Sequence, residues 1–354
     1  MSTVLTIRAD AGAEIGAGHV MRCLAIAHAW MHQGGSAVLL AHNLDPSLQT
    51  RLRHAGVAYR PHPGKWPDVC DLEATLAVMK PLLQQGGSAP WLVLDGYHFN
   101  AQFMTVLSRE GVALCVLDDM ANQPFFPASL IVNPNCYAPQ LHYNGPSSLR
   151  TLLGSAYVML REEFCTPQCR PAAWVDTPGA NLLVTMCGGE ASSVLLELQD
   201  ILADILVEKL HVRIVAGFSC AQLDSLVHLA ATQPYRCEVL GGVENMAPLL
   251  DWADGAISAA GGTAWELAHA GVPAGLVVLA ENQERIAATL AADGAALFLG
   301  HAPGLDRNAT ATTVMRLLTD VALRKELVSK GKGLVDGKGP ERIVAAMKDV
   351  AHAG

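Results

Sequence analysis

Short apolar runs alternate with segments of helical periodicity along the chain, and this alternation occurs twice. In the first half, the strand-like runs are "TVLTIRAD", "SAVLLAH", "VAYRP", "WLVLDGY", "ALCVLDD" and "SLIVNP". The spacing between them predicts helices over residues 20–31, 45–54, 71–83 and 101–109. Nearly continuous Val, Ile and Leu runs separated by helices are typical of a parallel sheet that is covered on both faces.

The pattern is interrupted at residues 165–180, where "CTPQCRPAAWVDTPGA" contains three prolines and no periodicity. Strand-like runs then resume as "NLLVTMCGG", "HVRIVAGF", "YRCEVLGG", "GAISAAGG", "AGLVVLA" and "AALFLG", and residues 342–351 form a last helical segment. We therefore predict a first domain over residues 1–165, a linker over 166–180 and a second domain over 181–337. Residues 338–354 are expected to form a helix that packs back on the first domain.

The predicted fold is α/β, with two doubly wound, Rossmann-like domains that face each other across a cleft. The length of 354 residues suits two such domains. In open parallel sheets, ligands bind outside the carboxyl ends of the strands, where the strand order reverses. Motifs at strand ends are therefore the first candidates for function, and because the cleft is complete within one chain we expect a monomer.

Charge and composition exclude several classes of partner. The formal net charge of -9 is spread without a Lys/Arg-rich run, so nucleic acid is not an expected partner. No apolar stretch is long enough to span a bilayer, and "MSTVLTIRAD" does not resemble a secretory signal, so we predict a cytoplasmic protein without membrane insertion. Nine scattered cysteines indicate reduced thiols, and the close pair Cys165 and Cys169 lacks the second pair that a zinc site needs.

The loop "IRADAGAEIGAGH" follows the first strand and precedes a helix, as a phosphate-binding turn does. Its glycines Gly12, Gly16 and Gly18 do not fit G-x-G-x-x-G, and the second strand, "SAVLLAH", does not end in an acid that would hold a ribose, so a nicotinamide cofactor is not expected. No lysine follows the loop, so it is not a P-loop. His19 lies in the first helical turn, where the helix dipole disfavours the protonated ring. A neutral histidine is a usable general base. The alternative is a histidine that caps or packs at the helix start.

A second cluster lies in residues 257–296, where another strand ends in glycines. Its candidate ligand contacts are Gly261, Gly262, Thr263, Glu266, Asn282 and Gln283. The backbone amides after the glycines can hold a diphosphate at the helix N-terminus, and Glu266 can accept hydrogen bonds from ribose hydroxyls. The two amide side chains offer donors and acceptors to a sugar. Helix capping and turn chemistry explain each residue equally well when it is taken singly.

Taken together, this second cluster resembles the nucleotide-sugar half of the GT-B glycosyltransferases related to the peptidoglycan GlcNAc transferase. Segments along nearly the whole chain resemble, in order, the family of UDP-2,4-diacetamido-2,4,6-trideoxy-β-L-altropyranose hydrolases of pseudaminic acid biosynthesis. Those segments are "RADAGAEIGAGHVMRCLAIA", "LVLDGYHF", "VLDDMAN", "LLGSAYVMLREEF", "AENQ" and "VDGKGPERI".

The resemblance implies a metal-independent, cofactor-independent hydrolase of GT-B architecture. In such an enzyme, water displaces UDP from a UDP-sugar at the anomeric carbon with inversion. The family's base falls on His19, and the nucleotide contacts fall on the Gly261-Gly262-Thr263 turn for the diphosphate and on Glu266 for the ribose. Asn282 and Gln283 are expected to touch the phosphate or the sugar.

Two arginines have both a ligand role and a structural alternative. Arg161, in "LREEF", is placed to meet the leaving diphosphate as a forked donor, or to form a salt bridge with Glu162. Arg22 lies on the same helix face as His19, and it either binds phosphate or pairs with Asp10; we favour the structural role.

Acidic residues at the ends of the strands add further candidates. Asp95 and Tyr97, in "LDGYHF", are expected to contact the sugar, although packing and capping explain them equally well. Asp95, Asp118 and Asp119 are also alternative bases, as in glycosidases that use paired carboxylates.

The second domain departs from the family pattern in one loop. Members commonly read Gly-Gly-Ser-Asp after its first strand, whereas this chain reads Gly188-Gly189-Glu190-Ala191, with both glycines kept as candidate phosphate contacts. The change leaves the identity of the sugar open. Three function classes therefore remain: the hydrolase, a GT-B glycosyltransferase that uses a UDP-sugar donor, and a non-catalytic protein that binds nucleotide sugars.

Overall fold

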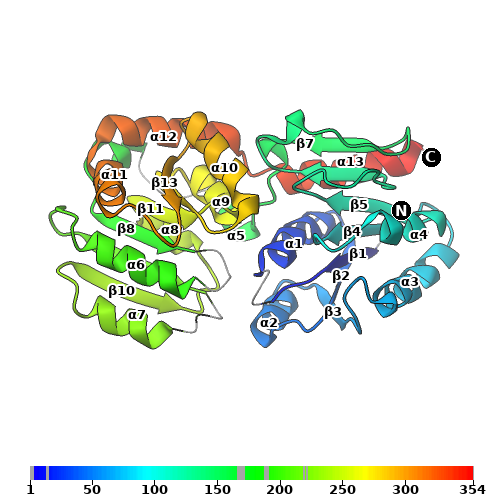
Figure 1. Ribbon diagram of the computed structural model, residues 1–354. Helices are drawn as coiled ribbons and strands as arrows, with labels where there is room; N and C mark the ends of the chain where they lie inside the picture. The colour runs from blue at the N-terminus through cyan, green and yellow to red at the C-terminus, as the bar shows by residue number, and fades with distance from the viewer. Residues whose placement is uncertain are drawn as a thin grey trace. The chain divides into compact units, whose positions relative to one another are not determined.

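The computed structural model describes residues 4–12, 16–165, 172–186, 191–217, 220 and 222–353. The chain forms two compact units (Figure 1). Unit 1 contains Met1–Glu162 and Lys338–Gly354, and unit 2 contains Glu163–Gly337. The chain therefore passes from one unit to the other twice. Within the described ranges, no helix is both long enough and apolar enough to cross a membrane.

Unit 1 is built on a parallel sheet of seven strands in the order β3-β2-β1-β4-β5-β6-β7. The strands are β1 (Val4–Ala9), β2 (Ser36–Ala41), β3 (Ala58–Pro61), β4 (Trp91–Asp95), β5 (Ala113–Leu117), β6 (Leu130–Asn133) and β7 (Arg150–Leu153). The order reverses between β1 and β4, which pair with Ala9 opposite Asp95. This reversal is where doubly wound sheets bind their ligands.

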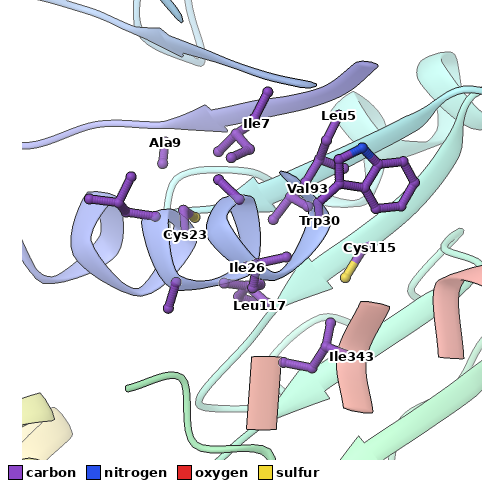
Figure 2. Close-up of a cluster of buried hydrophobic side chains, with 14 of the residues drawn as sticks. Leu5, Ile7, Ala9, Cys23, Ile26, Trp30, Val93, Cys115, Leu117 and Ile343 are labelled. Atoms are coloured by element: carbon purple, nitrogen blue, oxygen red, sulfur yellow. The ribbon is translucent and has the colours of Figure 1, made fainter. Parts of the chain in front are cut away.

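Helices cover both faces of this sheet. They are α1 (Gly18–Met31), α2 (Pro46–His54), α3 (Val69–Gln84), α4 (Ala101–Arg109) and α13 (Gly339–Ala353), with α5 (Glu162–Cys165) at the boundary of the units and short 3-10 turns at Ala138–Gln140 and Ser155–Tyr157. Figure 2 shows the core under α1, where Cys23, Ile26 and Trp30 pack with strand residues and with Ile343 of α13. On the opposite face, Met79 of α3 and Phe103 of α4 belong to a second core.

Unit 2 repeats this plan with a parallel sheet of six strands in the order β10-β9-β8-β11-β12-β13. Its strands are β8 (Asn181–Thr185), β9 (His211–Ala216), β10 (Arg236–Gly241), β11 (Gly255–Ala259), β12 (Ala274–Val278) and β13 (Leu297–His301). Its helices are α6 (Ser192–Leu202), α7 (Leu223–Ala230), α8 (Ala247–Trp252), α9 (Gly262–Ala270), α10 (Glu281–Ala292), α11 (Arg307–Thr319) and α12 (Val321–Leu334), with a 3-10 turn at Ala172–Asp176. The strand order reverses between β8 and β11. The predicted α/β fold of two doubly wound domains is therefore confirmed.

A fully buried ion pair joins α3 to β1. Arg8 donates from Nε to Asp71 Oδ1 at 3.0 Å and from Nη2 to Asp71 Oδ2 at 2.8 Å, and both side chains are completely buried. Asp68, the N-cap of α3, accepts a hydrogen bond from the Cys70 amide at the protein surface. These two aspartates lie at the same helix end but differ in burial, so they make a matched pair for a stability test.

We expect Asp71→Ala to lower the free energy of unfolding of unit 1 by about 3–5 kcal/mol, because it leaves a buried guanidinium short of one partner. Asp68→Ala removes only a cap and should cost about 1 kcal/mol. Urea unfolding followed by circular dichroism would measure both losses. Equal losses for the two variants would contradict a stabilising role for the buried pair.

Candidate active site

His19 is the second residue of α1 and lies at the point where the strand order of unit 1 reverses. Its ring is nine-tenths buried, and Nδ1 is 2.7 Å from Oδ1 of Asp95, the last residue of β4. The edge of the ring meets Tyr97, with ring centroids 5.0 Å apart. Neighbouring strands β1 and β4 thus bring together a histidine and a carboxylate that are 76 positions apart in the sequence.

The ionisation of Asp95 determines which nitrogen of His19 carries the hydrogen. Asp95 is completely buried, which by itself raises the pKa of its carboxyl group. The charges of Arg22 and His19, with their hydrogen bonds, outweigh burial and hold the pKa of Asp95 well below its usual range. An ionised carboxylate only accepts hydrogen bonds, so Nδ1 of His19 is the donor. In the neutral ring, Nε2 then carries the lone pair.

Arg22, one helical turn after His19, links two carboxylates. It donates to Asp95 from Nε at 2.6 Å and from Nη2 at 2.7 Å, and its Nη1 lies 3.0 Å from both oxygens of Asp119. Asp119 also accepts hydrogen bonds from the Tyr97 hydroxyl and the Asn135 amide, each at 3.0 Å. Burial raises the pKa of Asp119, but the charge of Arg22 outweighs this and keeps the pKa low.

These contacts correct one of the sequence-based expectations and bear on a second. Arg22 does not pair with Asp10, because Asp10 is bound to Arg8 at 2.6 Å. Asp95 is buried, and both of its oxygens are engaged by His19 and Arg22, so its position suits orienting His19 and does not suit contact with a sugar. Sequence spacing along one helix cannot show which strand end the arginine will reach.

Asp118, the other alternative base, holds its own loop. Its Oδ1 accepts hydrogen bonds from the amides of Met120 and Ala121 and from the hydroxyl of Tyr143. Burial raises the pKa of Asp118 above its usual value. One oxygen of Asp118 accepts all three of these hydrogen bonds, so the residue is placed to hold its loop together. His19, in contrast, offers a ring nitrogen, Nε2, as the base.

The loop before His19 is only partly described. Gly12 and Gly16 form an antiparallel bridge, in which the Gly16 amide donates to the Gly12 carbonyl at 2.7 Å, and Gly16 has a φ of 68° that favours glycine. Gly18 is the first residue of α1. Arg161 is half-buried and directly precedes α5. The predicted contacts Gly188 and Gly189 lie outside the described residues, so the structure does not bear on them.

In unit 2, the predicted nucleotide residues gather at the carboxyl ends of β11 and β12, which are neighbours in the sheet. Gly261 is the N-cap of α9, and Gly262 and Thr263 form its first turn, which contains no acidic residue. Glu266 follows one turn later and is 9% exposed. This helix starts beside the point where the strand order reverses, so its N-terminus is placed to attract an anion.

Asn282 and Gln283 lie in the first turn of α10, directly after β12. The side-chain oxygen of Gln283 accepts a hydrogen bond from the Leu279 amide at 2.9 Å. This contact closes the turn between β12 and α10 and supports the capping alternative for that oxygen. The side-chain oxygen of Gln283 is thus already hydrogen-bonded within its own turn, whereas Asn282 is an exposed residue of that turn.

Sequence reasoning gave no functional role to several polar residues around this site. Asn135 supports Asp119, and a second histidine–carboxylate pair, Asp10 with His98, follows β1 and β4 at the same sheet edge. Position after a buried strand was the available signal for both Asp10 and His98. Among the described residues, no group of three or more His, Cys, Asp or Glu side chains is arranged to hold a metal ion.

Comparisons with known proteins place the fold. No family model matches the chain. Over 212 residues, 59% of the chain, it is 27% identical to the spore coat polysaccharide biosynthesis protein SpsG of Bacillus subtilis (strain 168), and it spans 58% of that protein's length. A glycosyltransferase from Rickettsia africae matches at a TM-score of 0.68 with 10% identity and full coverage of both chains. UGT2 of Phytolacca americana, solved with UDP-2fluoro-glucose and pterostilbene, matches at 0.67 with 15% identity and full coverage of both. The chain therefore has the two-domain fold of the GT-B glycosyltransferases.

Proposed function

We propose that this chain is an enzyme that acts on a UDP-sugar, with His19 as the general base for the nucleophile that displaces UDP. The observation that carries the proposal is the 2.7 Å contact between His19 Nδ1 and the buried, ionised Asp95. The GT-B fold and the similarity to SpsG support the choice of a nucleotide sugar as the substrate class.

The geometry suits proton transfer at Nε2. Asp95 accepts the hydrogen bond from Nδ1–H, which fixes the ring and its tautomer and leaves the lone pair of Nε2 for an incoming O–H. When Nε2 takes that proton, the Asp95 carboxylate stabilises the imidazolium. Arg22 holds Asp95 in place through two hydrogen bonds, so the orientation of His19 depends on a rigid polar network.

The charges around His19 favour a sugar and disfavour a phosphate. Arg22 is paired with Asp95 and Asp119, so its guanidinium faces two carboxylates. This group of one guanidinium and two carboxylates therefore carries an excess of negative charge. Such a site stabilises the positive charge that develops on a sugar ring during displacement and repels the diphosphate.

We assign the nucleotide to unit 2. The amides of the first turn of α9, after Gly261 and Gly262, would hold the diphosphate, and Glu266 would accept hydrogen bonds from the ribose. Asn282 and Gln283, at the end of the adjacent strand, would contact the phosphate or sugar. UGT2, which shares the fold, was solved with UDP-2fluoro-glucose, and this supports a uridine nucleotide as the ligand.

Two nucleophiles fit this chemistry, water and a hydroxyl group. The family resemblance of the sequence supports water, and thus inverting hydrolysis of a UDP-diacetamido-trideoxy sugar in pseudaminic acid biosynthesis. Similarity in fold to a glycosyltransferase supports the second candidate, transfer to a hydroxyl acceptor, and the comparisons favour this candidate. His19 would have the same role in both reactions.

One assay separates these candidates. The protein is incubated with UDP-N-acetylglucosamine and, separately, with a UDP-2,4-diacetamido-2,4,6-trideoxyhexose, without any acceptor, and released UDP is measured. Catalytic UDP release identifies a hydrolase, and proton NMR of the fresh product shows whether the anomeric configuration has inverted. The incubation is then repeated with an added hydroxyl acceptor, and UDP release that occurs only in its presence identifies a transferase. Binding of the UDP-sugar without UDP release, both with and without an acceptor, would contradict an enzymatic function.

We expect Glu266→Ala to raise KM for the UDP-sugar about tenfold or more with little change in kcat, because ribose contacts bind the ground state and the transition state alike. Glu326→Ala, which changes an exposed residue of α12 in the same unit, is the matched control and should leave both constants unchanged. A normal KM for the Glu266 variant would place the nucleotide elsewhere.

A further inference from the structure

Asp10 and His98 form a second histidine–carboxylate pair in unit 1. The Asp10 side chain is 4% exposed, and its Oδ1 accepts hydrogen bonds from Arg8 Nη1 at 2.6 Å and from the His42 amide at 2.7 Å. Its other oxygen, Oδ2, is buried, lies 3.4 Å from Nε2 of His98, and has no hydrogen-bond partner among the described residues. Nε2 of His98 is likewise buried without one.

Two facing polar atoms of this kind need an explanation, because buried polar groups in folded proteins are nearly always hydrogen-bonded. The hydrogen-bonding groups of the neighbouring residues Arg8 and His62 are already in use. Arg8 uses its remaining donors on Asp71 and on the Leu40 and Gly64 carbonyls, and His62 contacts Gly64 and Thr75. The unsatisfied capacity is therefore concentrated at one spot, between the carboxylate of Asp10 and the ring of His98.

This spot lies at the sheet edge that carries His19. Ala9 of β1 is opposite Asp95 of β4, and Asp10 is the next residue after β1, whereas His98 lies in the loop that follows β4. Both histidine–carboxylate pairs thus arise from the same two strand ends. Asp95 turns toward α1, while Asp10 turns with Arg8 toward α3, so the two pairs flank the point where the strand order reverses.

Charge limits what can bind there. Burial lowers the pKa of His98 to about 4, so this ring is neutral at pH 7. Burial raises the pKa of Asp10, but its hydrogen bond and charge interaction with Arg8 bring the pKa below the usual value. A carboxylate beside a neutral imidazole binds a group that both donates and accepts hydrogen bonds, such as a hydroxyl or an acetamido group, and repels an anion.

We propose that Asp10 and His98 form a sugar-recognition subsite. A hydroxyl or acetamido group of the substrate donates to Asp10 Oδ2 and accepts a hydrogen bond from His98 Nε2–H. This inference rests on the proposed function in one respect, namely that the ligand is a sugar nucleotide. It adds that unit 1 selects the sugar, at a place distinct from the base, whereas the nucleotide contacts belong to unit 2.

The test compares binding of UDP with binding of UDP-sugars. Calorimetry measures Kd for UDP, UDP-glucose, UDP-N-acetylglucosamine and a UDP-2,4-diacetamido-2,4,6-trideoxyhexose, using wild type, His98→Phe, His98→Gln and Asp10→Asn. His98→Phe keeps a ring to pack on Phe99 but has no polar atom. His32→Phe, at the exposed histidine that caps the C-terminus of α1, is the control.

We expect His98→Phe to weaken binding of the preferred UDP-sugar roughly tenfold or more and to change the Kd of UDP by less than about twofold. His98→Gln, whose amide donates and accepts, should recover most of the loss, and Asp10→Asn should weaken UDP-sugar binding as well. A loss limited to the N-acetylated sugars would identify the acetamido group, whereas a loss that includes UDP-glucose would identify a hydroxyl.

Parallel losses for UDP and UDP-sugars, or no loss in any variant, would overturn the subsite. Because the readout is binding, a wild-type protein that binds UDP-sugars without releasing UDP would refute the proposed enzyme and leave the subsite standing. Where a variant fails to fold, a crystal structure of the wild-type complex decides. A sugar oxygen or nitrogen within about 3.2 Å of Asp10 Oδ2 supports the subsite, and a water molecule alone there refutes it.

Discussion

His19→Asn is expected to lower kcat roughly 10²- to 10⁴-fold while the Kd of UDP stays within about twofold of wild type. Asparagine is similar in size and forms hydrogen bonds, but it cannot take the proton of the nucleophile. UDP is a good leaving group and needs no protonating acid, so loss of the base accounts for the full effect. Single-turnover measurement of UDP release, with calorimetry for UDP, separates chemistry from binding.

The matched control is His28→Asn, on the same helix. His28 lies near Glu162, away from Asp95, so this variant should keep kcat. If His19→Asn keeps kcat within about tenfold of wild type, the role of base passes to a carboxylate. Asp119 is a weak base for that role because its pKa is low and its oxygens are held by Arg22, Tyr97 and Asn135.

Asp95→Asn is expected to lower kcat by a similar factor, roughly 10²- to 10⁴-fold, by reversing the tautomer of His19. The amide of asparagine can donate to Nδ1, which places the ring hydrogen on Nε2, where it blocks proton transfer. Because the two residues act as a unit, the double variant with His19→Asn should be little worse than His19→Asn alone.

Asp119→Asn is the informative control for this experiment. It also removes an ionic partner of Arg22, but Asp119 makes no contact with Nδ1 of His19 among the described interactions. A smaller loss of kcat for Asp119→Asn than for Asp95→Asn would assign the effect to the histidine tautomer. Equal losses, or additive losses in the double variant, would indicate general disruption of the network.

Much of the fold was predictable because buried strands have a strong local signal. The strand-like runs of both halves contain β1 to β6, β8 to β12 and all of β13 except its last residue, and the predicted helix over residues 101–109 coincides with α4. The strand β7 was not predicted, because its four residues, Arg150–Leu153, are half exposed at the edge of the sheet and lack the continuous apolar run. A short edge strand is defined by its neighbour more than by its own sequence.

The residues of the candidate site could be predicted from the sequence, but the contacts between them could not. Strand ends and glycine-rich turns pointed to His19, Asp95 and Asp119, because these residues follow buried apolar runs. Their partners depend on the strand order, since β4 lies beside β1 although β2 and β3 come between them in the sequence. The link of Arg22 to Asp119, 97 positions away, has no local signal at all.

The last helix has a consequence for how the chain is made. Ile343, Val344 and Met347 of α13 are completely buried in the core that α1 forms with the sheet of unit 1. All of residues 163–337 must therefore be synthesised before this core can be completed. At about 5–20 residues per second, this delay is roughly 10–35 s. During that time a nascent unit 1 exposes an apolar face, which makes it a natural client for chaperones, while unit 2 has its whole sequence available before α13 is made.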